Sequence, residues 1–131
     1  MYEQLLSVEC DNENVAHADG LAARYYTDPA HFELEKTQIF HRSWICVGHQ
    51  CMAKEPGDYF VANVADQEVL VVRNHEGKLN AFFNVCRHRG HAVASGSGQC
   101  ERIVCPYHAW AYDLDGRLLK APYSEHVPSF D

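Results

Sequence analysis

The sequence lacks any long hydrophobic run and is short of positive charge. It has 131 residues, with 11 Lys and Arg against 18 Asp and Glu, which gives a net charge of −7. No apolar segment approaches the roughly 20 residues that a membrane helix needs. The first residues, MYEQLLSVECDNEN, are acidic and do not look like a signal or transit peptide. We therefore expect no membrane association, and the acidic balance argues against a nucleic-acid partner.

A disulfide-type spacing of cysteines is also missing. Six Cys in a short secreted chain would suggest a disulfide framework, but four of them show no such spacing: Cys10, Cys46, Cys51 and Cys100. The simplest interpretation is a reducing, cytoplasmic location in which these four are buried or incidental thiols. The length fits one small domain.

Two Cys and two His form a pattern that is typical of metal ligation. C-R-H-R-G-H begins at Cys86 and C-P-Y-H begins at Cys105, so His88 and His108 each follow a Cys closely. Iron and zinc both accept thiolate and imidazole ligands. Cys₂His₂ zinc fingers pair like ligands, whereas each pair here is mixed and the first gap is a single residue. The spacing favours an iron–sulfur cluster; a zinc site and four unrelated loop residues are the alternatives.

These four residues resemble the ligands of a Rieske [2Fe–2S] cluster. The resemblance implies that Cys86 and Cys105 bind one iron, while His88 and His108 bind the other. Two imidazoles in place of two thiolates make such a cluster less negative, so its reduction potential is higher than that of an all-Cys cluster.

The flanking residues resemble the large (α) subunits of Rieske non-haem iron oxygenases, which hydroxylate aromatic rings or demethylate amines. Respiratory-chain Rieske proteins carry two further Cys that bridge the ligand loops, and His91 and Tyr107 stand at those positions here. They also have a Ser where this chain has Trp110, whose indole donates only one hydrogen bond. Fewer donors to sulfur predict a potential in the lower part of the Rieske range of about −150 to +300 mV.

Three more residues near the ligands are candidates for a supporting role. Tyr112 matches a Tyr that the respiratory proteins aim at a cysteine sulfur; an ordinary strand aromatic is the alternative. Arg87 and Arg89 flank the first His, where they could dock a partner carboxylate, stabilise the reduced cluster, or simply form a solvated loop face. His91 lies either against the cluster edge or in a turn.

A helix is expected before a β-rich region. Asp28 is a good N-cap and Pro29 suits the first helical position, which predicts a helix over about 28–41. Strands are predicted from β-rich runs between turn signals at 44–49, 58–64, 68–74, 79–85, 102–104 and 109–113. The predicted fold is mostly β: an N-terminal extension, residues 1–43, precedes a Rieske-type antiparallel β-sheet domain, residues 44–131, with two cluster-binding loops at strand ends.

The resemblance covers about residues 25–131, and members that demethylate quaternary amines look most similar. It implies an electron-transfer domain that takes electrons from a reductase or ferredoxin and passes them, with His108 on the exit side, to an oxygenase catalytic domain or a neighbouring α subunit in an oligomer. The family holds its mononuclear iron on two His and one carboxylate, in a further domain. No such set stands out here, so we expect the front part of an α subunit without catalytic residues. A stand-alone Rieske ferredoxin-type carrier is the alternative.

Overall fold

The computed structural model describes residues 20–127 and 130 and divides into two units, Met1–Trp44 and Ile45–Asp131. In the first unit, a single helical turn, α1 (Arg24–Thr27), is followed by α2 (Pro29–Glu35), which continues as a π-helical turn, η2 (Lys36–Phe40). The carboxylate of Asp28 caps α2 by accepting a hydrogen bond from the N–H of Ala30 at 2.9 Å. The turn α1 was not predicted. Among the described residues, no helix is long and apolar enough to cross a membrane.

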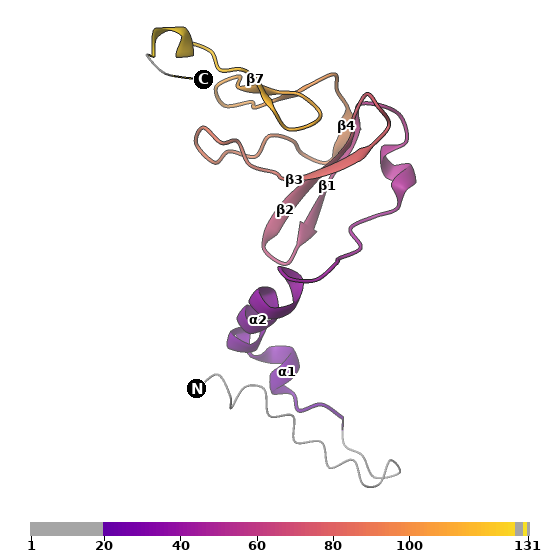
Figure 1. Cartoon of the computed structure of the whole chain (residues 1–131). Coiled ribbons are helices and arrows are strands. Elements are labelled where there is room, and N and C mark those ends of the chain that lie inside the picture. Colours follow the sequence, from indigo (N-terminus) through magenta and orange to yellow (C-terminus); the bar gives the residue numbers. More distant parts are fainter. Residues whose placement is uncertain (1–19, 128–129, 131) are drawn as a thin grey trace. The chain divides into compact units, whose positions relative to one another are not determined.

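The second unit contains two antiparallel sheets (Figure 1). The first has the order β3–β2–β1–β4, with β1 (Asp58–Val64), β2 (Gln67–Arg73), β3 (Leu79–Phe83) and β4 (Ser97–Gln99). The second has the order β5–β6–β7, with β5 (Ile103–Val104), β6 (Ala111–Tyr112) and β7 (Leu118–Lys120). Two 3₁₀ turns, η3 (Gln50–Ala53) and η4 (Ser124–His126), complete the unit. The predicted antiparallel, mostly β class is confirmed.

The predicted strand at 44–49 is wrong, because this segment packs through side chains instead of pairing through its backbone. Val47 packs against the buried cluster of Ala53, Phe60 and Val71. Gly48 lies so close to β1 that an added Cβ would meet the Phe60 ring at 3.1 Å. The short strand β4 was missed, since its sequence S-G-Q has little β-propensity and is recognised only by its pairing with β1.

The main core of the second unit joins the two sheets. Its buried members come from both sheets and from both ligand loops: Leu70, Val72, Cys86, Ile103, Cys105, Tyr112 and Leu114. The two cysteines of the predicted site are therefore core residues as well as candidate ligands.

The turn after β6 is tied to the first sheet by hydrogen bonds. The Asp115 carboxylate accepts from the side-chain amides of Asn74 and Asn80, each at 2.8 Å. Next to it, Gly116 has φ +83° and lies so close to the Phe82 ring that an added Cβ would meet it at 2.7 Å. These contacts fix the sheet that carries the second ligand loop against the sheet that carries the first.

Candidate metal centre

The two ligand loops share one backbone hydrogen-bond pattern. The N–H of Cys86 donates to the carbonyl of His91, five positions later, at 2.7 Å. The carbonyl of Cys86 accepts from the N–H of Gly90, four positions later, at 2.9 Å. The corresponding bonds around Cys105 measure 2.8 and 3.0 Å. Each loop is therefore a closed turn of the same length that begins at its Cys. The candidate His ligand follows two positions after Cys86 in the first loop and three positions after Cys105 in the second.

The fourth residue after each Cys has a left-handed backbone. In the first loop this residue is Gly90, with φ +71°, and in the second it is Ala109, with φ +57°. Glycine adopts this conformation readily, whereas for alanine it costs about 1–2 kcal/mol. The second loop thus holds a strained residue in order to reproduce the shape of the first.

Both cysteines are buried, and Tyr112 bonds to one of them. Cys86 and Cys105 are each 2% exposed. The Tyr112 hydroxyl accepts a hydrogen bond from the N–H of Arg87 at 3.2 Å, which leaves its hydrogen free to point at the Cys86 sulfur, also 3.2 Å away. Burial alone would raise the pKa of Cys86, but hydrogen bonds from Tyr112, the Cys105 side chain and the backbone at His88 and Arg89 together outweigh burial and lower it.

The Tyr112 hydroxyl stays protonated at neutral pH. Its burial, followed by its hydrogen bond to Cys86, raises the pKa of Tyr112 to about 12. At neutral pH the hydroxyl therefore keeps a hydrogen that it can donate to the sulfur, which is the role that the resemblance suggests.

The two histidines lie together on the exposed side of the loops. The ring centroids of His88 and His108 are 4.8 Å apart, and both residues are exposed. His88 is stacked on Trp110 with an interplanar angle of 3°, and His108 is stacked on Tyr107 with centroids 3.8 Å apart. Loss of hydration, and then the charges of His88 and Arg89, lower the pKa of His108. These contacts fix both imidazole planes.

The donor set fits a two-iron cluster better than a single ion. Two thiols face the core and two imidazoles face solvent. A structural zinc ion would need all four donors within about 2.0–2.3 Å of one point. Among the described residues, no three His, Cys, Asp or Glu side chains are placed to share one metal ion. A Rieske cluster gives one pair of ligands to each iron, so the two pairs do not have to converge.

A buried asparagine that the sequence analysis missed holds the base of the first loop. Asn84 is 6% exposed. Its side-chain oxygen accepts from the N–H groups of Val93 and Ala94 at 3.1 and 3.0 Å, and its amide donates to Glu68 and to the Ala94 carbonyl, each at 2.8 Å. The only sequence signal is a polar residue inside the apolar run F-F-N-V that precedes Cys86.

The remaining candidate residues surround the imidazoles. Arg87 and Arg89 are exposed. His91 lies beside Tyr107, with ring centroids 5.6 Å apart, and its Nδ1 lies 2.7 Å from the carbonyl oxygen of Ala92. His91 therefore belongs to the turn that closes the first loop.

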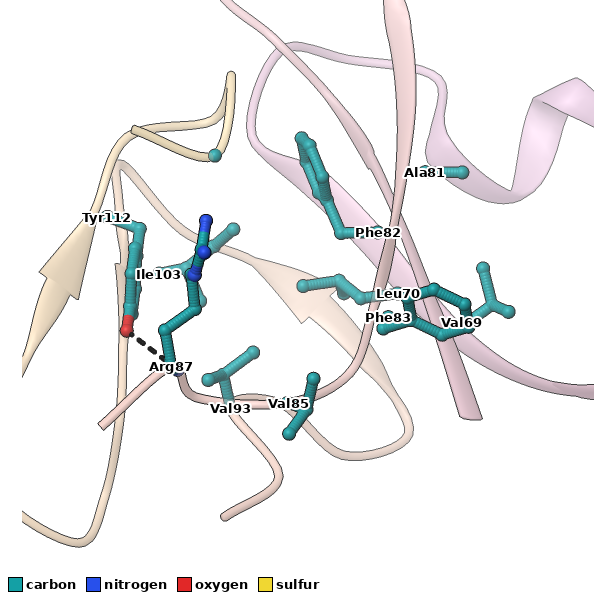
Figure 2. Close-up of a pocket in the computed structure, with 11 residues that line it drawn as sticks. Val69, Leu70, Ala81, Phe82, Phe83, Val85, Arg87, Val93, Ile103 and Tyr112 are labelled. Atoms are coloured by element: carbon teal, nitrogen blue, oxygen red, sulfur yellow. Dashed lines mark hydrogen bonds between the residues drawn. The ribbon is translucent and has the colours of Figure 1, made fainter. Parts of the chain in front are cut away.

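Two cavities adjoin the site. One, of about 590 Å³, is lined by apolar residues of both sheets and by Arg87 and Tyr112, and Figure 2 shows the hydrogen bond between these two residues at its edge. The other, of about 470 Å³, lies on the exposed side. It is lined by Arg87, His88, His108, Trp110 and part of the segment 122–130.

Comparison with known proteins identifies the family. The family model described as the Rieske [2Fe-2S] domain matches residues 43–131. The chain belongs to this family, and its cofactor is a [2Fe–2S] cluster. The expectation drawn from the two mixed Cys/His loops is thus confirmed, and the zinc alternative is set aside.

Similar sequences are oxygenase subunits. The carnitine monooxygenase oxygenase subunit of Acinetobacter baumannii is 42% identical over 130 residues, which cover 98% of this chain and 34% of that protein. The glycine betaine monooxygenase oxygenase subunit of Chromohalobacter salexigens is 44% identical over 98 residues, covering 74% of this chain and 22% of that protein. The chain thus spans about a third or less of these relatives.

Solved structures give the same result. A quaternary ammonium Rieske monooxygenase, described for carnitine oxidation and inter-subunit electron transfer, is 46% identical with a TM-score of 0.78, over 82% of this chain and 30% of that one. A naphthalene 1,2-dioxygenase is 33% identical with a TM-score of 0.76, over 82% of this chain and 24% of the dioxygenase chain. The matched part is the Rieske domain of oxygenase subunits, which supports membership of an oxygenase over a stand-alone ferredoxin.

Proposed function

We propose that Cys86, His88, Cys105 and His108 hold the [2Fe–2S] cluster and that the chain transfers electrons within a multicomponent oxygenase. The observation that carries this proposal is the division of the four donors. The two thiols are buried in the core, and the two imidazoles are exposed side by side at 4.8 Å. When bound, the cluster supplies one-electron oxidation and reduction.

The protein groups around the site have distinct tasks. The core excludes water from the thiolates of Cys86 and Cys105, and Tyr112 donates to the Cys86 sulfur. Trp110 holds the plane of His88. Because the imidazoles are the exposed ligands, a redox partner approaches the site from their side, and His108 is the exit toward an acceptor.

The partners are a reductase or ferredoxin as electron donor and a mononuclear iron site as acceptor. That iron site would be held by an oxygenase catalytic domain or a neighbouring α subunit in an oligomer. Arg87 and Arg89 are exposed beside His88 and supply positive charge for docking a partner carboxylate. Outside the cluster site, the described cysteines Cys46, Cys51 and Cys100 are free thiols, which fits a reducing, cytoplasmic location.

The substrate class of the whole oxygenase is a quaternary ammonium compound. The carnitine, glycine betaine and choline monooxygenases match this chain at 42–44% identity, whereas the naphthalene dioxygenase matches at 33%. Aromatic-ring hydroxylation is therefore the second candidate.

Ligand variants of the full chain test the site. Cys86→Ser and His108→Ala should lose most of their iron and acid-labile sulfide, because losing one ligand exposes an iron to hydrolysis. His75→Ala, which changes an exposed turn histidine outside the site, should keep both. Full iron and sulfide in Cys86→Ser would show that the ligand assignment is wrong.

Electron transfer is tested with the cluster-loaded chain and the reductase of a quaternary ammonium monooxygenase. Visible absorbance should bleach by one electron per chain, with no oxygen uptake when carnitine or glycine betaine is added. Arg89→Gln should slow reduction by the reductase but not by dithionite, while Arg117→Gln, in the turn between β6 and β7, should slow neither. Substrate-dependent oxygen uptake by the chain alone would contradict the proposal.

A further inference from the structure

A cysteine and a histidine outside the ligand loops form a close pair. The Nδ1 atom of His49 lies 3.0 Å from the sulfur of Cys51, at the start of the turn η3. Both side chains are exposed, and neither takes part in the metal centre. A thiol in hydrogen-bond reach of an imidazole, with that imidazole oriented by a third group, is the arrangement of an activated nucleophile.

The backbone determines which atom of this pair carries the proton. The N–H of Cys51 donates to the same Nδ1 atom of His49 at 3.2 Å. Nδ1 therefore has no hydrogen of its own, since it accepts this bond. The thiol of Cys51 must be the donor in the sulfur–nitrogen contact, so the imidazole is placed to receive its proton.

A positively charged side chain is anchored on the turn that carries the pair. The guanidinium of Arg73 donates to the carbonyls of Ala53 at 2.6 Å and Gln50 at 3.5 Å, which brings a positive charge to the turn that carries Cys51. Cys46 is a natural comparison: it is also an exposed free thiol, but among the described residues no side chain forms a hydrogen bond with its sulfur. Both cysteines are exposed, but among the described residues only Cys51 has an imidazole within hydrogen-bond distance of its sulfur.

We propose that Cys51 and His49 form a modification site that reacts with small disulfides. The Cys51 sulfur attacks one sulfur of the disulfide; a new S–S bond forms and the old one breaks. The thiol proton passes to His49 Nδ1 and then to the departing thiolate, so the products are a mixed disulfide on Cys51 and one free thiol. No other oxidant is needed, because the disulfide is itself reduced.

The test uses the cluster-loaded full chain with Cys10 changed to Ser and the aromatic disulfide 5,5′-dithiobis(2-nitrobenzoate) as the probe. After reaction with one equivalent, peptide mass spectrometry should find the mixed disulfide mainly on Cys51. The release of thionitrobenzoate should show a phase that is about tenfold or more faster than the reaction of Cys46. Cys51→Ser should remove this phase, and Cys46→Ser should leave it unchanged.

His49→Asn separates the role of the base from that of the fold. Asn keeps an acceptor for the Cys51 N–H, as a good cap does, but it takes up no proton. The fast phase should fall to the rate of Cys46, with unchanged circular dichroism and visible spectrum. Equal labelling of Cys46 and Cys51 in the parent protein, or an unchanged rate in His49→Asn, would overturn the proposal; the first measurement needs no substitution of either residue.

Discussion

The hydroxyl of Tyr112 lies 3.2 Å from the sulfur of Cys86 and accepts the N–H of Arg87 at the same distance. One phenol thus connects β6 of the second sheet to the ligand loop that follows β3 of the first sheet. It both donates to a candidate ligand and satisfies a backbone N–H of the loop, so its removal should be visible in redox potential and in stability.

Tyr112→Phe should lower the reduction potential by about 40 mV, because a donor worth about 1 kcal/mol favours the more negative, reduced state. The free energy of unfolding should also fall by about 1 kcal/mol, since the Arg87 N–H loses its acceptor. Voltammetry and denaturant unfolding measure the two effects. Tyr107→Phe is the control, because no hydrogen bond of the Tyr107 hydroxyl is found among the described residues. An unchanged potential in Tyr112→Phe would mean that the phenol does not bond to a ligand sulfur.

Asn84→Ala should lower the free energy of unfolding by about 3 kcal/mol. It leaves the N–H groups of Val93 and Ala94 and the Ala94 carbonyl without their partner in a mostly buried site. The loss should appear in urea unfolding followed by circular dichroism, and iron should be released faster on dilution into a chelator. A change below about 0.5 kcal/mol, which is typical of surface sites, would contradict the assigned role.

Ala109→Gly should raise the free energy of unfolding by up to about 1 kcal/mol. It relieves the left-handed strain at φ +57°, although glycine loses more entropy on folding. Gly90→Ala at the matching position of the other loop should have the opposite sign, and thermal unfolding of the two variants checks both. Destabilisation in both would show that the two turns are not equivalent.

Asp115 should make part of the stability depend on pH. Hydrogen bonds from Asn74, and then Asn80, lower the pKa of its carboxyl group. A lowered pKa gives a contribution to the free energy of unfolding that is complete above the pKa of the unfolded state, about 3.9. This contribution is lost as the pH falls through the lower pKa of the folded state. Asp115→Asn should therefore be less stable than the parent at neutral pH, and the difference should shrink as the pH falls through this window. A difference that stays constant from pH 7 down to acid unfolding would exclude this linkage.

The candidate ligands and the type of cofactor could be inferred from the sequence because the information they need is local. Two Cys and two His in short, mixed pairs define a ligand class before any fold is known, and the apolar runs that precede them predicted β1, β2 and β3. The candidate ligand Cys86 could be named from its spacing alone. The structure adds where each donor lies: thiols in the core and imidazoles at the surface.

What the sequence did not predict depends on contacts between distant segments. The equal turns around Cys86 and Cys105 are held by backbone hydrogen bonds, which cannot be inferred from the residue types. Asn84 acts through Val93 and Ala94, nine and ten positions away. The segment 44–49 has strand composition but packs through Val47, because its neighbours in space, not its own propensity, decide whether it pairs.

The most direct test of the account is pulsed electron paramagnetic resonance on the reduced, cluster-loaded chain, prepared with ¹⁵N-labelled histidine and compared with unlabelled protein. The account predicts a rhombic signal with couplings to two coordinated imidazole nitrogens that change on labelling, assigned to His88 and His108. A reduced cluster without nitrogen coupling, or a purified chain that holds one zinc ion and no iron, would contradict it.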